Sequence, residues 1–134
     1  MSFNKIISHS HDGYVELVID GYEDWDSAVD SISEMADVAE RDGLSRFLID
    51  FRRVDMRVSP SEAPDIAKFF NSFCTFGFSL GLILPEDRYA ARTAQAFAEA
   101  IAGLGHPVAF LATPAERAAW VAHGSARARR TGTA

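Results

Sequence analysis

The first candidate functional site in the sequence is a pair of serines at the start of a predicted helix. Ser59 and Ser61 precede an apolar helical pattern, where a phosphate would meet free backbone N–H groups and the positive end of the helix dipole. Arg52, Arg53 and Arg57 lie shortly before them and could pair with such an anion. The same Ser-Pro-Ser-Glu run is also an ordinary helix start with a hydroxyl cap. Capping is favoured because it explains the residue types without a kinase.

A cluster of phenylalanines is the second candidate site. Neighbouring residues on a helix point about 100° apart, so one helix face cannot bury every ring fully. Three interpretations remain, in this order of preference: core filling, an interface with another chain, and a pocket for an apolar ligand. The cluster consists of Phe69, Phe70, Phe73, Phe76 and Phe78.

The histidines and the single cysteine do not form a catalytic or metal-binding pattern. His9, His11, His106 and His123 lack the spacing of a metal site, and no third ligand is placed near the first two. Cys74 lies in an apolar helical segment, where cysteine usually acts as a small hydrophobe, and a lone cysteine excludes a disulfide framework. We therefore expect no metal site.

Several carboxylates gather around one predicted strand and the helix after it. A paired acid and base is conceivable there, but helix capping and a solvated face explain the residues better. No glycine-rich nucleotide-binding motif occurs, so a nucleotide site has no support and we expect no cofactor. No catalytic motif stands out, so we expect no enzyme. The carboxylates are Asp12, Asp20, Glu23, Asp24 and Asp26.

Length and composition limit the class of protein. The chain has 134 residues, of which 48% are hydrophobic and 24% charged, which excludes a disordered chain and suits one domain. Its net charge of −6 disfavours non-specific nucleic-acid binding, which needs a basic face. No apolar run approaches the roughly 20 residues of a membrane span, and the first residues lack the apolar region of a signal peptide. We therefore expect a soluble cytoplasmic protein.

Hydrophobic periodicity predicts the order β-β-α-β-α-β-α-β-α. Asp24 and Gly43 are suited to begin and end the first helix, and the capping pattern Thr-Pro-Ala-Glu begins the last at 113–116. Strands that alternate with helices predict an α/β fold with a largely parallel sheet. The strands are expected near 3–10, 14–19, 46–51, 78–84 and 107–111, and the helices near 24–42, 61–76, 87–103 and 114–123.

The ends of these elements set the expected domain boundaries. Residues 52–60 read as a polar connection between a strand and a helix. Gly124 is expected to close the last helix, so that residues 1–124 form one domain. Residues 125–134 are then a flexible tail, in which Arg127, Arg129 and Arg130 are solvated.

This order resembles the STAS domain, the fold of anti-sigma-factor antagonists, and above all its SpoIIAA-like (STAS/Sec14-like) branch. The resemblance covers about residues 5–123. It is carried by the element order, by Phe-Leu-Ile-Asp at 47–50 before the second helix, and by the terminal helix from the Thr-Pro-Ala-Glu start to Trp120. It implies a mostly parallel mixed sheet flanked by helices and a non-enzymatic regulatory or binding module.

The same resemblance implies a position for a phosphorylated serine. In the antagonists of that family, an Asp-Ser-Ser/Thr-Gly element follows the third strand, and its serine is phosphorylated. Counted from 47–50, that element falls on residues 58–61. Ser59 stands at the phosphorylated position, whereas Val58, Pro60 and Ser61 replace the aspartate, the second hydroxyl and the glycine.

Our preferred functional hypothesis is a cytoplasmic protein-interaction module of unknown partner. It would self-associate, as a homodimer, through an apolar helix or sheet surface. The alternative is a carrier of a small apolar or lipid-like ligand, which would use the phenylalanine-rich second helix. A third hypothesis is an enzyme built on the carboxylates or on Cys74.

Overall fold

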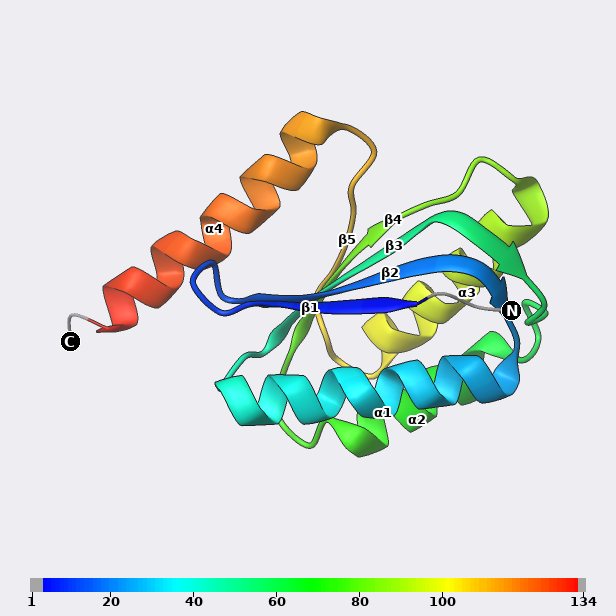
Figure 1. Ribbon diagram of the computed structural model, residues 1–134, viewed down its shortest axis with the longest axis horizontal. Coiled ribbons are helices and arrows are strands. Elements are labelled where there is room, and N and C mark those ends of the chain that lie inside the picture. Colours follow the sequence, from blue (N-terminus) through cyan, green and yellow to red (C-terminus); the bar gives the residue numbers. More distant parts are fainter. Residues whose placement is uncertain (1–3, 133–134) are drawn as a thin grey trace.

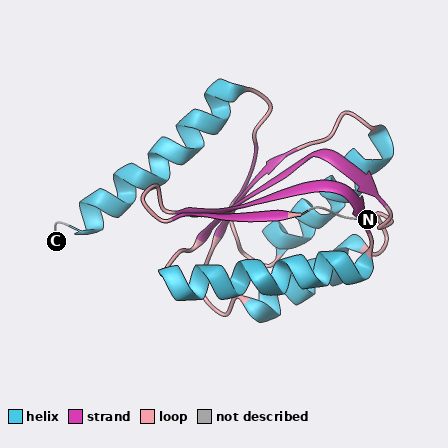
Figure 2. Cartoon of the chain, in the orientation of Figure 1, coloured by secondary structure: helices cyan, strands magenta, loops and turns pink. Residues whose placement is uncertain are grey.

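The computed structural model describes the backbone of residues 4–132 and the side chains as far as residue 124. Its elements follow the predicted order, so the predicted α/β fold is confirmed (Figures 1 and 2). They are β1 (Lys5–His9), β2 (Tyr14–Glu23), α1 (Trp25–Asp42), β3 (Arg46–Met56), α2 (Ala63–Phe73), β4 (Ser79–Ile83), α3 (Arg88–Gly103), β5 (Val108–Phe110) and α4 (Pro114–Gly132).

The five strands form one sheet in the order β1-β2-β3-β4-β5. Strand β1 is antiparallel to β2, and the remaining pairs are parallel, as expected for strands joined by crossover helices. Val15, Phe47 and Leu80 lie side by side in register and are fully buried. Figure 1 shows α1, α2 and α3 against one face of the sheet and α4 against the opposite face.

Aromatic rings fill the core between the sheet and α2. The ring centroid of Phe47 lies 5.1 Å from that of Phe70 and 5.5 Å from that of Phe78. Phe70 and Phe78 are 4.8 Å apart, and Phe97 of α3 approaches Phe70 at 6.1 Å. Edge-on and tilted rings at these distances gain attraction beyond simple area burial.

Helix α1 is bounded by the residues predicted to cap it. The Ser27 N–H donates to the Asp24 carboxylate at 2.9 Å, and the Asp24 N–H donates to the Ser27 hydroxyl at 2.9 Å. Gly43 ends the helix at φ 67°, in the left-handed region that glycine enters without a steric penalty.

Helix α4 is attached to the sheet through a tight contact at Gly81. A Cβ added at Gly81 would lie 3.0 Å from the Trp120 ring, so the missing side chain lets the indole rest on β4. The Arg46 guanidinium lies 3.7 Å from the centroid of the same ring and donates to the Trp120 carbonyl. A Cβ at Gly124 would overlap Arg46, so Gly124 leaves room for that side chain.

Gly124 does not end α4, contrary to the sequence-based prediction. The helix continues to Gly132, so the segment expected as a tail is helical over most of its length, and residues 133–134 lie outside the described chain. The alanines and arginines after Gly124 are strong helix formers. Their propensity outweighs the cost of one interior glycine, about 1 kcal/mol.

The limits of three further elements, β2, β3 and α2, also differ from the prediction. Strands β2 and β3 run on beyond an irregularity between Val18 and Asp20, so most of the predicted 52–60 connection is strand. The extension was not predicted because charged residues interrupt the apolar run after Phe51, although Val54 and Met56 pack against the core. Helix α2 runs from Ala63 to Phe73 instead of 61–76, since Cys74 leaves helical geometry at φ −110° and ψ 88°.

Replacing a phenylalanine of α2 with alanine should lower stability by different amounts on the buried and exposed faces of the helix. Phe70→Ala would leave a cavity in the core and should lower the free energy of unfolding by about 3–5 kcal/mol. Phe73→Ala removes a ring that is 42% exposed and should cost less than about 1 kcal/mol. Urea unfolding of both variants measures the difference, and equal losses would contradict the assigned faces.

Candidate functional site

The two candidate serines form a polar turn just before α2. The Ser59 N–H and hydroxyl donate to the same Glu62 carboxylate oxygen at 3.0 and 2.8 Å, and the two serine hydroxyls lie 3.0 Å apart. These hydrogen bonds from Ser59 lower the pKa of Glu62. Glu62, which precedes the first residue of α2, makes no side-chain cap bond. The turn is thus held by Ser59 and Glu62, and the hydroxyl cap expected from the Ser-Pro-Ser-Glu run is not formed.

A phosphate on Ser59 would stand beside a carboxylate. The Glu62 oxygen is within 2.8 Å of the hydroxyl that would carry it, and like charges this close repel. The structure also gives each candidate arginine its own acidic partner. These pairs are Arg52–Asp50 at 2.7 Å, Arg53–Asp20 at 3.5 Å and Arg57–Asp55 at 3.0 Å. The phosphosite or anion site at Ser59 stays a prediction.

The phenylalanine cluster is divided between the interior and the surface. Phe70 and Phe78 belong to the core, and Phe76 is half-buried against it. Phe69 and Phe73 are 39% and 42% exposed on the outer side of α2. The core interpretation therefore holds for the first group, and the interface interpretation applies only to the second.

The exposed rings join a third aromatic side chain from α1. Phe69 meets Trp25 edge-on at a centroid distance of 5.5 Å and stacks with Phe73 at 6.5 Å. Trp25, Phe69 and Phe73 form what we call the α1–α2 aromatic patch. Asp65 and Lys68 border the hollow between Trp25 and Phe69.

An acidic surface lies next to this patch. The buried side of α1 contains Ile32 and Met35, and helical spacing places its five outward acids on the opposite side. Trp25 lies at the border between the two sides, where it reaches α2. The exposed acids are Asp26, Asp30, Glu34, Asp37 and Glu40.

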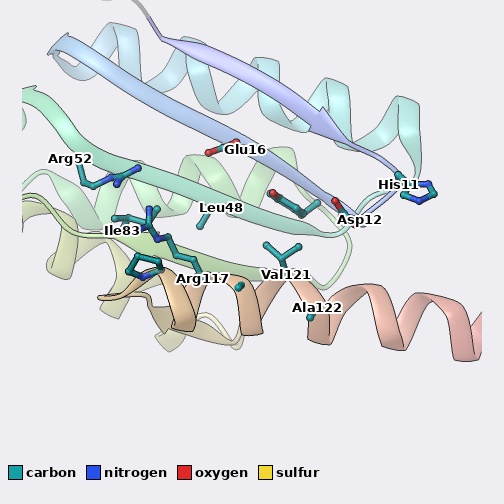
Figure 3. Close-up of a pocket in the computed structure, with 12 residues that line it drawn as sticks. His11, Asp12, Glu16, Leu48, Arg52, Ile83, Arg117, Val121 and Ala122 are labelled. Carbon is teal, nitrogen blue, oxygen red and sulfur yellow. The ribbon is translucent and has the colours of Figure 1, made fainter.

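A second surface feature is a cleft of about 880 Å³ between α4 and the open face of the sheet (Figure 3). Leu48 of β3 and Ile83 of β4 supply apolar surface from the sheet, and Val121 supplies it from α4. Arg52 and Arg117 lie at one end and His11 and Asp12 at the other. We call this feature the sheet-face cleft.

Asp50 anchors one of the cleft arginines. Its carboxylate accepts hydrogen bonds from the Arg52 N–H at 3.0 Å, Nε at 3.0 Å and Nη2 at 2.7 Å. Burial acts to raise the pKa of Asp50, but the Arg52 hydrogen bonds and the charges of Arg52 and Arg117 together lower it. Asp50 therefore stays ionised and holds Arg52 along the sheet.

His9, His106 and Cys74 occupy structural positions, whereas His11 and His123 are exposed. His9 bonds to Glu16 at 2.8 Å, and His106 bonds to Asn71 at 2.8 Å while stacking on Phe78. Burial raises the pKa of the Cys74 thiol to about 11, which keeps it protonated near neutral pH. Within residues 4–124 no three histidine, cysteine or carboxylate side chains are grouped as a metal site requires.

The clustered carboxylates are dispersed among separate contacts. Asp24 caps α1, Asp20 pairs with Arg53, and Asp26 is exposed. Glu23 is buried, which raises its pKa, and it accepts hydrogen bonds from Asn4 and Ser27. These carboxylates therefore cap a helix, pair with an arginine, accept buried hydrogen bonds or face solvent. Of the five, Asp12 lines the sheet-face cleft.

Comparison with known proteins identifies the fold. No family model and no curated protein matches the chain. A solved structure described as the anti-sigma factor antagonist SpoIIAA in its unphosphorylated form matches with a TM-score of 0.52. The match covers 88% of this chain and 94% of that chain at 13% identity. The chain has the SpoIIAA fold. This match confirms the fold predicted from the sequence. None of the described helices is long and apolar enough to cross a bilayer.

The sheet-face cleft was missed by sequence reasoning. Its residues come from three strands, a turn and the last helix, so no local pattern brings them together. One signal was available: Leu48 and Asp50 alternate with buried Phe47 and Ile49, which places the first two on the opposite face. Arg117 carried no signal, because a single arginine on a polar helix is ordinary.

The Asp50–Arg52 pair predicts a pH-dependent loss of stability. Since the folded-state pKa of Asp50 lies below its ordinary value of 3.8, the stabilisation is complete above that value and disappears as pH falls through the folded pKa. Asp50→Asn should therefore lower the free energy of unfolding by about 1–3 kcal/mol at neutral pH. The difference in the free energy of unfolding between Asp50→Asn and the parent protein should disappear in acid.

Urea unfolding across the pH range measures this difference. Asp65→Asn is the matched control, because its pair with Lys68 at 3.9 Å is exposed and should contribute less than about 1 kcal/mol. A constant difference between Asp50→Asn and the parent protein at every pH would refute the assigned role of the charge.

Proposed function

We propose that the protein is a non-enzymatic interaction module that docks a partner helix on the α1–α2 aromatic patch. The observation that carries this proposal is the exposure of Phe69 and Phe73, at 39% and 42%, with Phe69 in ring contact with both Trp25 and Phe73. Aromatic side chains gathered on a surface are typical of the buried centre of protein interfaces. Their contacts with one another hold the rings in place before a partner binds.

The fold supports a docking role. The matched SpoIIAA structure is described as an anti-sigma factor antagonist, a protein defined by its action toward another protein. A SpoIIAA fold is therefore compatible with regulation through contact. The protonated Cys74 and the dispersed carboxylates fit a module without covalent chemistry.

Charge favours a basic amphipathic helix as the occupant. The exposed acids of α1 begin at Asp26, next to Trp25, and run along the helix, and Asp65 of α2 adds a carboxylate at the hollow. Among the residues whose side chains are described, Lys68 is the one basic residue that lines the hollow between Trp25 and Phe69. A helix with apolar anchors for the rings and lysine or arginine on its flanks complements both parts of this surface.

A second copy of the chain fits this surface less well. In a symmetric pair each copy would present the same acidic flank to the other, which costs free energy at low salt. The homodimer expected from the sequence therefore becomes an outcome that the experiment must separate from docking of a basic partner. The expected cytoplasmic location remains part of this proposal.

A synthetic amphipathic peptide of leucine and lysine tests the proposal, with a leucine and glutamate peptide of the same pattern beside it. Backbone NMR shifts near Trp25, Phe69 and Phe73 should move with the lysine peptide alone. Phe69→Ala/Phe73→Ala should weaken binding at least about tenfold, as expected for loss of interface anchors. Added salt should also weaken binding.

Tyr89→Ala is the matched control, because Tyr89 is 48% exposed on α3 and is not part of the patch. Its binding should equal that of the parent protein. Equal binding of both peptides, or unchanged binding in the double variant, would overturn the proposal. So would a dimer, measured by light scattering, that the double variant separates into monomers.

A further inference from the structure

The sheet-face cleft has the dimensions and lining of a small-molecule site. Its volume of about 880 Å³ lies within the range of such pockets, about 300–1,000 Å³. Leu48 and Ile83 form its floor, where they are 4% and 5% exposed, and Ala118 and Val121 line it from α4. An apolar body resting on this floor beside α4 would lose part of its contact with water.

Arg117 brings hydrogen-bond donors into this cleft that no side chain within residues 4–124 accepts. It is half-buried on α4, and Figure 3 shows it pointing toward the strands beside Ile83 and Arg52. No hydrogen bond or ion pair within residues 4–124 involves its guanidinium, which carries five N–H donors. Asp50 acts on it only through its charge, since the hydrogen bonds of that carboxylate come from Arg52.

Arg52 contributes further donors at the same end. Its Nε and Nη2 are bound to Asp50, whereas Nη1 has no hydrogen-bond partner among the residues whose side chains are described. Arg52 is half-exposed, with 52% of its side chain open to solvent. Asp50 and Glu16 both act on Arg52 through their charges, so the recognition of an anion here rests on the unbonded N–H donors of the two guanidiniums. A planar carboxylate matches the geometry of two guanidinium groups.

The acidic groups of the cleft limit the charge of the ligand. Glu16, which is hydrogen-bonded to His9, lies along the cleft, and Asp12 lies at the end away from Arg117. Both carboxylates repel a second negative charge on a ligand that extends toward them. This arrangement disfavours nucleotides and other polyanions, and it favours one carboxylate on an apolar body.

We propose that the sheet-face cleft binds a small monocarboxylate, with its carboxylate on Arg117 and Arg52 and its apolar body between Leu48, Ile83 and Val121. The site lies on the face of the sheet opposite the α1–α2 aromatic patch, so it does not depend on the docking function. It also differs from the phenylalanine-lined pocket considered from the sequence, because none of those five rings lines this cleft.

Octanoate is the probe, and octylammonium is the matched probe with the same chain and the opposite charge. Titration followed by backbone NMR should give saturable shifts at Leu48, Ile83, Arg117 and Val121 with octanoate. Octylammonium and inorganic phosphate should give none. Arg117→Gln should weaken octanoate binding at least about tenfold, the loss expected when a charged hydrogen-bonding partner is removed.

Two more variants separate the site from general effects of charge or folding. Arg92→Gln removes an exposed arginine from α3 and should bind octanoate as the parent protein does. Ala118→Phe keeps both arginines and fills the apolar part of the cleft, so it should also lose octanoate. The proposal is overturned by absent saturation, by equal binding of octylammonium, or by unchanged binding in Arg117→Gln. Retained patterns of backbone shifts show that each variant is folded.

Discussion

The alternation of side chains along the central strands is the constraint on which the rest of the structure depends. Successive residues of a strand point to opposite faces, so burying Val15, Phe47 and Leu80 under the helices commits Tyr14, Leu48 and Gly81 to the other face. Three helices cover the first face, and α4 covers only part of the second. The sealed core and the open cleft are therefore two consequences of one register. A shift of one residue would exchange them.

The same constraint explains why α4 is held so differently from the other helices. Helices α1, α2 and α3 pack apolar stripes on a continuous core, whereas α4 meets the sheet through a small cluster that includes Tyr14, Leu48 and Trp120. The absence of a side chain at Gly81 lets Trp120 approach, and Arg46 covers the outer side of the ring. A helix fixed near one point along its length leaves space beside that point. The sheet-face cleft occupies this space.

Local features of this structure follow from the sequence more directly than long-range ones do. The first helix was predicted with both of its caps, because Asp24 and Gly43 act on backbone groups a few residues away. The extension of β2 and β3 could not be predicted in this way, because the charged side chains of the extension are stabilised by pairing across strands. The division of the phenylalanines lies between these cases: the spacing showed that not all could be buried, and tertiary packing decided which ones were. Cleft residues such as Arg117 meet only after the chain has folded.

The two proposed sites can be tested separately because the sheet stands between them. Phe69 and Phe73 lie on the outer side of α2, where Phe69 contacts Trp25 of α1, whereas Arg117 and Ile83 line the cleft on the opposite face of the sheet. The nearest link is β3, where buried Phe47 packs on Phe70 of α2 and its neighbour Leu48 lines the cleft. A ligand that altered docking would have to act through this strand, whose close-packed rings resist small displacements. The geometry thus favours two independent binding surfaces on opposite sides of one rigid sheet. Different variants can therefore impair partner docking and carboxylate binding separately.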